Sequence, residues 1–402
     1  MLEELLQSEV QQYVRENEHV DINQLLLKGV EVAGVCAKDL VTQINGRLKA
    51  KSKLPEWYSS QNIIFPAKIS MEQCSSQQTA KYKAEIFQAE SMVDLTGGAG
   101  VDIHAFSKTF NKCTYLEQNT ELCEVTTHNL TTLGASNVST YRTTAENFLD
   151  ENNAQFDLIY LDPARRGAAQ KKVFRFEDCT PNVVSLMSSL LNRAGHVMVK
   201  TAPFLDITQA LSQLNHVKEI HVVAVNNECK EVLYLMSNEV SHDDQIAVHT
   251  VNLHKDKPAQ KFVFVLQKEA ESPIAYTLPN KYIYEPNTAI LKSGGINSAG
   301  HQYNLGKLHP NSQLFTSESF IEEFPGRIFE CLDILKYDKK AIAKAIPAGK
   351  ANITTRNFPH DVVQIRKKTG LKDGGEDYLF ATTNLHNEKI ILLTKKLDDP
   401  MS

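Results

Sequence analysis

The sequence of 402 residues predicts an α/β fold, in which a doubly wound parallel sheet follows a helical region and precedes a compact α+β module. Three observations favour this fold. Apolar runs of strand length alternate with helical segments between residues 92 and 236. The first run ends in a glycine-rich loop, and beyond residue 236 the strands no longer alternate regularly with helices.

Four segments are expected along the chain. Residues 1–70 have apolar positions at helical spacing and predict a helical N-terminal region, and residues 71–238 hold the predicted parallel sheet. Residues 239–328 read as a mixed region with plain strands, and residues 329–398 as the α+β module. In and around that module we expect a strand at 327–335, a helix ending at residue 344, a strand at 351–355, a helix at 361–369 and a hairpin at 377–397.

The composition narrows the class of protein. Apolar residues make up 42% of the chain, which is ordinary for a globular protein, and no stretch reaches the eighteen or so continuous apolar residues of a membrane span. The start, Met1-Leu2-Glu3-Glu4, lacks the basic residues of a signal peptide, so we expect a cytoplasmic protein. Seven cysteines without a Cys-x-x-Cys pair, and thirteen histidines without His-Glu-x-x-His spacing, indicate neither a disulfide framework nor a metal site.

The loop at residues 94–102, Asp-Leu-Thr-Gly-Gly-Ala-Gly-Val-Asp, follows the first predicted strand of the sheet and precedes a helix. Glycine lets a backbone pass close to a ligand and tolerates positive φ, so the loop predicts a nucleotide-like cofactor. Ile103 occupies the place of the third small residue of a dinucleotide fingerprint, which disfavours NAD. The loop also lacks the Gly-Lys-Ser/Thr ending of a P-loop, which disfavours ATP.

The elements after the loop continue the alternation. A second strand at 114–117 ends in Glu117, about twenty residues after the loop, where a carboxylate can accept both ribose hydroxyls of a cofactor. Ala145 and Glu146 follow the third strand, where an adenine contact would lie. The remaining predicted elements are a helix containing Asn129, strands at 138–141, 156–161 and 195–200, a helix at 182–191, and a closing pair at 220–225 and 232–236.

These motifs, in this order, resemble those of bacterial class I methyltransferases with a ferredoxin-like insert and a C-terminal THUMP-like domain. The resemblance covers nearly the whole chain and rests on QCSS at 73–76, the glycine loop, LDPARR at 161–166, VKTAP at 199–203, YEPN at 284–287 and ANITTRNFP at 351–359. It implies a Rossmann-like sheet and S-adenosylmethionine (SAM) as cofactor. Because THUMP-type modules bind structured RNA, it also implies tRNA or rRNA as substrate.

Cofactor contacts are expected from the segment before the first strand, where residues 70–83 can cover the cofactor as a lid, and from the ends of the strands. The expected residues are Thr79, Lys83, Asp94, Thr96, Gly98, Gly100, Asp102, Glu117, Ala145, Glu146 and Asp162.

The methylated atom stays open between a base and a ribose hydroxyl. Asp162 and Arg165 stand where amino-methylating enzymes carry Asn/Asp-Pro-Pro-aromatic, and an arginine can also stack on a base. The segment resembles the Asp-Pro-Pro-Arg of uracil-5-methyltransferases too, but the cysteine nucleophile they need is replaced by Lys200-Thr201. Ribose 2′-O-methylation would use a Lys-Asp-Lys-Glu set. Its candidates are Lys83, Asp162, Lys200 and either Glu228 or Glu231.

Charge is distributed unevenly along the chain. Residues 336–372 hold ten Lys or Arg against two acidic residues, a net charge of +8, so the rest of a chain of net charge −5 carries −13. A basic segment attached to an acidic protein favours RNA binding there. The expected RNA contacts are Lys350, Arg356, Arg366, Lys367 and Lys368. A non-catalytic SAM-binding RNA-binding protein and a small-molecule methyltransferase remain alternatives, and the sequence indicates no oligomeric state.

Overall fold

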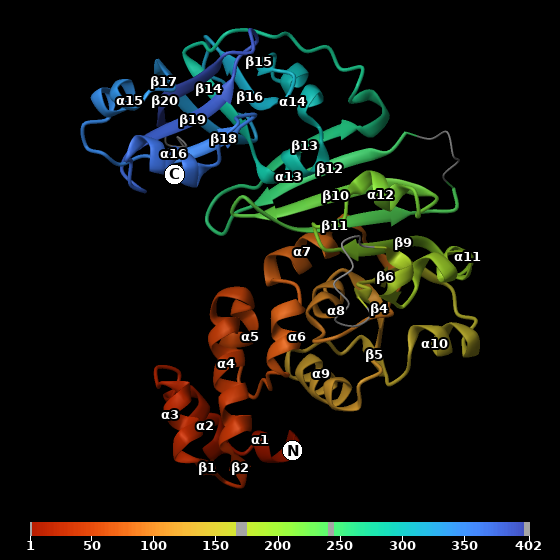
Figure 1. Cartoon of the computed structure of the whole chain (residues 1–402). Coiled ribbons are helices and arrows are strands. Elements are labelled where there is room, and N and C mark those ends of the chain that lie inside the picture. The colour runs from red at the N-terminus through yellow and green to blue at the C-terminus, as the bar shows by residue number, and fades with distance from the viewer. Residues whose placement is uncertain (1, 166–174, 240–244, 398–402) are drawn as a thin grey trace. The chain divides into compact units, whose positions relative to one another are not determined.

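The computed structural model describes residues 2–165, 175–239 and 245–397 (Figure 1). The chain forms two compact units, of which the first comprises Met1–Val217 with Leu233–His242 and the second comprises Lys218–Val232 with Asp243–Ser402. Within the described residues, no helix is both long and apolar enough to cross a membrane.

The first unit begins with short helices, as expected for residues 1–70. They are α1 (Leu2–Leu5), α2 (Ser8–Glu16), α3 (Ile22–Lys28), α4 (Ala37–Lys53), α5 (Pro55–Ser59) and α6 (Lys68–Gln73), followed by α7 (Gln77–Ile86). Val10, Leu40 and Ile44 are fully or almost fully buried at their shared core. A two-stranded hairpin of β1 (Glu31–Val32) and β2 (Val35–Cys36) interrupts the helices and was not predicted from the sequence.

A sheet with parallel strand pairs follows in the first unit, with the order β11-β9-β6-β3-β4-β5. The strands are β3 (Ala89–Asp94), β4 (Phe110–Leu116), β5 (Val138–Tyr141), β6 (Phe156–Leu161), β9 (Ala194–Thr201) and β11 (Glu228–Met236). Of β11, only residues 233–236 belong to this unit, and residues 228–232 belong to the second. The chain runs from β3 outward through β4 to β5 and then returns to β6 on the other side of β3. Such a reversal of strand order opens a crevice at the carboxyl ends of the strands, where α/β sheets bind ligands.

Helices connect these strands. They are α8 (Val101–Phe106), α9 (Thr120–Thr132), α10 (Ala145–Glu151), α11 (Val183–Arg193) and α12 (Ile207–Leu211). Side chains cap the first turns of all of them except α8, which begins after Gly100. Asn119, Thr144 and Asn182 each accept a hydrogen bond from a backbone N–H of the helix that they precede, which satisfies a donor without an intrahelical partner. A short pair of β7 (Ala164–Arg165) and β8 (Cys179–Thr180), with a 3-10 turn at Phe176–Asp178, follows β6.

The second unit contains two sheets. The first has the order β13-β12-β10-β11, in which β10 (Val217–Val225) pairs in parallel with β12 (Ala247–Leu253), and β12 pairs antiparallel with β13 (Gln260–Val265). The predicted closing pair is therefore confirmed as β10 and β11, with Asn226 and Asn227 at positive φ between them.

The other sheet of the second unit has the order β15-β16-β14-β17-β20-β19-β18. Its elements, in chain order, are β14 (Tyr282–Pro286), α13 (Thr288–Ser293), α14 (Ile296–Gln302), β15 (Gly306–His309), β16 (Ser312–Ser317), β17 (Gly326–Lys336), α15 (Lys339–Ala345), β18 (Asn352–Arg356), α16 (Val362–Thr369), β19 (Asp377–Thr383) and β20 (Lys389–Lys396). All predicted elements of the C-terminal module are present. β14 and β17 pair directly, and the proposed division after residue 328 falls inside β17.

Candidate active site

The three glycines of the loop after β3 have different surroundings. A Cβ atom on Gly97 would lie 2.1 Å from a ring carbon of Tyr115, and one on Gly100, where φ is +77°, would lie 2.4 Å from Thr126. Packing therefore requires glycine at both positions. Gly98 also has positive φ, but among the described residues the atom nearest to its Cβ would be the backbone oxygen of Thr96, 3.7 Å away. Gly98 is thus the glycine that leaves room for a ligand close to the backbone.

Hydrogen bonds hold this loop against β4 and α9. The carbonyl of Gly98 accepts from the Tyr115 hydroxyl at 2.7 Å and from the Thr126 hydroxyl at 3.0 Å. Its N–H donates to Glu117 at 3.1 Å, and the other oxygen of that carboxylate accepts from the N–H of Asn119 at 2.8 Å. Each carboxylate oxygen has a second lone pair, so Glu117 is oriented and still able to accept from a ligand. Tyr115 and Thr126 were missed in the sequence, which carries no signal for these contacts.

Thr96 links the ends of β3 and β6. The buried carboxyl of Asp94 accepts two hydrogen bonds from Thr96, one from its N–H at 2.9 Å and one from its hydroxyl at 3.3 Å. The Thr96 hydroxyl in turn accepts a hydrogen bond from the N–H of Asp162 at 2.7 Å. Burial raises the pKa of Asp94 to about 8, and the neighbouring carboxylates of Asp102 and Asp162 act in the same direction. The hydrogen bonds from Thr96 lower the pKa but do not outweigh burial. Asp94 is therefore largely protonated at neutral pH, and a threonine at the place of the usual first glycine joins two strands.

A buried polar network lies between α7, α8 and β6. The Nζ atom of Lys83, which is fully buried, donates to the Ser75 hydroxyl at 3.0 Å and lies 3.2 Å from Asp102. The other Asp102 oxygen accepts from Ser75 at 2.9 Å and from the Tyr160 hydroxyl at 2.8 Å. Burial raises the pKa of Asp102, but Lys83, Lys200 and these hydrogen bonds outweigh it, so the pKa falls below its ordinary value. Within the predicted Lys-Asp-Lys-Glu set, Lys83 therefore pairs with Asp102.

Asp162 and Lys200 stand at the ends of two adjacent strands. β6 and β9 run parallel with Leu161 opposite Val199, and the Lys200 ammonium forms an ion pair with the Asp162 carboxylate. The Asp162 side chain is 35% exposed, whereas that of Lys200 is only 10% exposed. The structure therefore brings together two residues that the sequence placed at separate strand ends. Arg165 lies in β7, but its side chain and the whole of Arg166 are outside the described residues.

The remaining cofactor candidates occupy helix starts. Thr79 is buried in the first turn of α7, where its N–H donates to the Ser76 hydroxyl at 3.2 Å. Ala145 is buried and Glu146 half-buried in the first turn of α10, directly after β5.

The two glutamate candidates of the Lys-Asp-Lys-Glu set lie in β11. Glu228 is exposed and pairs with Lys230 at 2.7 Å, and Glu231 is buried. Both glutamates belong to the second unit.

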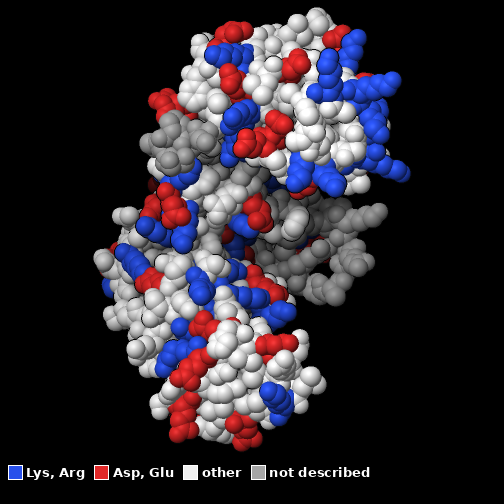
Figure 2. Space-filling view, turned by 90° about the vertical axis from the view of Figure 1, so that its left-hand side faces the viewer, with Lys and Arg blue, Asp and Glu red and all other residues white. Residues whose placement is uncertain are grey.

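The predicted RNA-contacting residues divide into two groups. Lys350, Lys367 and Lys368 are exposed. Figure 2 shows Lys and Arg side chains gathered at the upper right of the visible face. Lys368 nevertheless lies over the Tyr337 ring, with its Nζ atom 3.7 Å from the ring centroid. The two arginines are hydrogen-bonded within the protein. Arg356 donates to the buried Glu285 at 2.9 Å, and Arg366 pairs with Asp373 and donates to the Ala351 carbonyl at 3.2 Å. Both guanidinium groups are thus held in place by contacts within the fold.

Comparison with known proteins places this geometry in a family. A protein of Porphyromonas gingivalis W83, named "putative methyltransferase", has a crystal structure that matches with a TM-score of 0.86. The two chains are 31% identical over 97% of this chain and 98% of the other. The chain belongs to this methyltransferase family. The predicted resemblance and the predicted fold class are thereby confirmed.

Family models match three parts of the chain. A conserved hypothetical protein family, number 95, matches residues 77–227, which contain the glycine loop, Glu117, Asp162 and Lys200. A ferredoxin-like domain matches residues 282–325, and a THUMP domain-like family matches residues 326–396. The last two meet at the start of β17, although their strands share one sheet.

Two curated relatives come from strains of Mycobacterium tuberculosis, CDC 1551 / Oshkosh and H37Rv. Each is named an uncharacterized S-adenosylmethionine-dependent methyltransferase and is 22% identical over 222 residues. The match covers 54% of this chain and 57% of each relative, so the chain spans little more than half the length of these relatives.

Proposed function

We propose that this chain transfers a methyl group from SAM to structured RNA, either tRNA or rRNA. The observation that carries the proposal is the free space at Gly98 beside the oriented Glu117 carboxylate, at the reversal of strand order in a parallel sheet. The Asp162–Lys200 pair stands at the same edge of this sheet, at the ends of β6 and β9. Membership in a methyltransferase family and the SAM-dependent names of the curated relatives support it.

The residues of the glycine loop and of the strand ends fit such a cofactor. Glu117 would accept hydrogen bonds from the two ribose hydroxyls, and a ligand could approach the backbone closely at Gly98. Ala145 and Glu146, after β5, would contact the adenine. The cofactor supplies a methyl group on a positively charged sulfur, which is transferred in line to a nucleophile.

Positioning of the nucleophile is the main task left to the chain, and positioning alone is worth up to roughly 7–11 kcal/mol in favourable cases. The half-exposed Asp162 carboxylate would accept a hydrogen bond from an amine of a base or from a ribose hydroxyl. Lys200, held against it, would stabilise negative charge that develops on a hydroxyl oxygen. This arrangement would suit methylation of either a base amine or a ribose hydroxyl. Replacing Lys200 distinguishes the two targets, because only the hydroxyl would need its positive charge.

RNA is proposed as substrate because of the second unit. The segment 336–372 carries a net charge of +8, and its lysines at 350, 367 and 368 are exposed. The whole of this segment lies within the THUMP domain-like match. THUMP-type modules bind structured RNA. Neither a small-molecule methyltransferase nor a sheet domain alone needs such a basic segment.

The decisive experiment uses RNA from a strain that lacks this protein. Purified full-length protein is incubated with methyl-labelled SAM and either that RNA or a metabolite extract, and nucleoside mass spectrometry then identifies the product. We expect label in one modified nucleoside of the RNA and none in the metabolites. Label only in metabolites would establish a small-molecule enzyme. SAM and RNA binding without any labelled product would establish a non-catalytic RNA-binding protein.

A further inference from the structure

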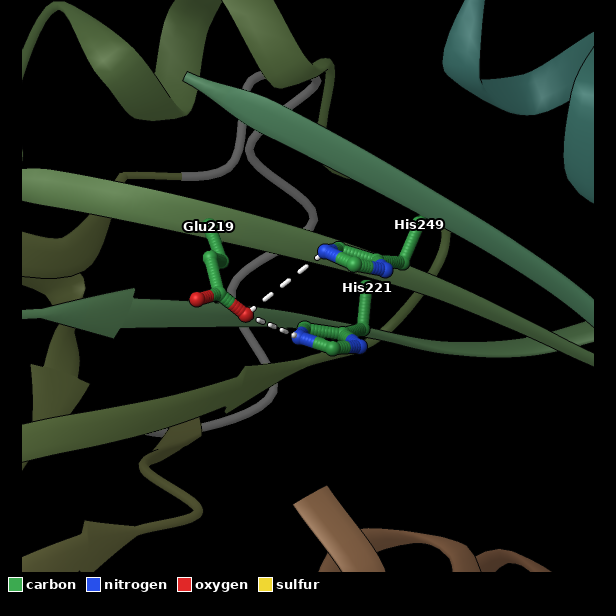
Figure 3. Close-up of side chains that lie close together, drawn as sticks. All are labelled: Glu219, His221 and His249. Carbon is green, nitrogen blue, oxygen red and sulfur yellow. Dashed lines mark hydrogen bonds and ion pairs between the residues drawn. The ribbon is translucent and has the colours of Figure 1, made fainter. Parts of the chain in front are cut away.

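A cluster of one carboxylate and two imidazoles lies on neighbouring strands of the second unit. Glu219 and His221 are two positions apart on β10, so both side chains point to the same face of the sheet. His249 on β12 is the register partner of His221 in the parallel pair. Figure 3 shows the three side chains directed toward one another.

The three ligand atoms are close enough to share one ion, since all lie within 4.8 Å of one another. The same Glu219 oxygen lies 3.2 Å from the Nε2 atom of His221 and 3.6 Å from the Nε2 atom of His249. The second distance is too long for a hydrogen bond. Ligands of a tetrahedral zinc ion with bonds of about 2.0–2.1 Å are roughly 3.3–3.4 Å apart. The two distances from Glu219 lie on either side of this range.

The side chains also have the right chemistry and access. His221 is buried, whereas the side chains of Glu219 and His249 are 25% and 33% exposed, so solvent and ions can reach the cluster. Two imidazole nitrogens with one carboxylate oxygen favour first-row transition metals over Mg²⁺ or Ca²⁺, which prefer oxygen ligands. The imidazole rings are stacked, with centroids 4.5 Å apart and planes 8° from parallel. Binding one ion through both Nε2 atoms therefore requires the rings to turn toward it.

We propose that Glu219, His221 and His249 bind one divalent transition-metal ion of the Zn²⁺ type, with water completing its coordination, and that this ion joins β10 to β12. These residues do not follow the His-Glu-x-x-His spacing, because that spacing belongs to a helix. Here two ligands come from one strand and the third from its neighbour. The site is independent of the proposed methyl transfer.

The test uses the full-length protein after removal of metal by a chelator. Calorimetric titration with Zn²⁺ is expected to show one ion bound per chain, together with a rise in the melting temperature that EDTA reverses. X-ray absorption at the zinc edge is expected to show nitrogen and oxygen ligands, with scattering typical of imidazole and no sulfur. Sulfur ligands would move the ion to a cysteine, such as the exposed Cys36, and overturn the proposal.

Variants locate the ion. His249→Gln, at a half-exposed position, and Glu219→Gln are each expected to weaken Zn²⁺ binding at least tenfold and to abolish the rise in melting temperature. His386→Gln, which replaces an exposed histidine in the same unit, is the matched control and is expected to bind like the wild type. If His249→Gln folds and binds Zn²⁺ with unchanged affinity, or if the wild type binds none, the cluster is an ordinary hydrogen-bonded group.

Discussion

At the scale of single residues, the loop after β3 separates glycines needed for packing from the one that leaves room for a ligand. Gly97 and Gly100 would clash with Tyr115 and Thr126 if they carried a Cβ atom, whereas Gly98 would not clash with any described residue. Sequence reasoning correctly placed the loop between a strand and a helix but could not make this distinction. The side chains that surround each glycine come from β4 and α9, more than fifteen residues away.

Gly98→Val is expected to abolish SAM binding, because the side chain would fill the space that the cofactor needs and would be strained at positive φ. The matched control is Gly134→Val. Gly134 also has positive φ and no described neighbour within 4 Å of a Cβ, but it ends α9 outside the loop. Calorimetry should therefore show SAM binding for the control alone. Equal binding by both variants would remove Gly98 from the site.

The raised pKa of Asp94 predicts how the stability of the fold depends on pH. Its pKa is raised to about 8, so between about pH 4 and 8 the folded protein keeps a proton that the unfolded chain releases. This group therefore makes the fold less stable as pH rises, by at most about 1.4 kcal/mol per pH unit. Asp94→Asn does not ionise and can still accept from Thr96. The melting temperature of the variant minus that of the wild type should increase from pH 5 to pH 8, and a constant difference would contradict the raised pKa.

At the scale of elements, the strands and helices around the sheet could be read largely from the sequence. β5 and β6 have the predicted bounds, because clear turn signals flank both segments. The hairpin of β1 and β2 was missed, since strands of two residues have no periodicity to detect. The pairing of Lys83 with Asp102 was missed for a different reason. It depends on how α7 packs against α8, which no spacing along the chain specifies.

Variants at the adjacent ends of β6 and β9 test the proposed roles of Asp162 and Lys200. Asp162→Ala and Lys200→Ala are expected to lower turnover by roughly 10²-fold or more while changing SAM affinity only a few-fold, because both would act on the nucleophile. Lys112→Ala, which replaces an exposed lysine on β4, is the control for the loss of a charge. Single-turnover rates and SAM binding measured on the same preparations provide the comparison. If Lys200→Ala keeps its single-turnover rate, ribose methylation is excluded and a base becomes the target.

At the scale of the whole molecule, charge and domain organisation bear on how RNA binding can be tested. Deleting residues from 329 onward would cut through β17, which pairs with both β14 and β20. Such a deletion would damage a sheet to which β14 and β16 also belong. Point variants at exposed lysines avoid this problem. Arg356 and Arg366 are unsuitable for that purpose, because each is bonded to an acidic residue of the fold.

The combined variant Lys350→Gln, Lys367→Gln and Lys368→Gln is expected to weaken RNA binding and leave SAM binding unchanged, since the three exposed lysines would contact phosphates. Each lost phosphate contact should reduce the slope of log affinity against log salt by about one unit, so the slope should flatten by up to roughly three. The control Lys255→Gln, Lys268→Gln and Lys281→Gln removes the same charge from exposed positions of the same unit outside the basic segment. If both triple variants change the slope equally, RNA responds to net charge alone and the basic segment is not its binding surface.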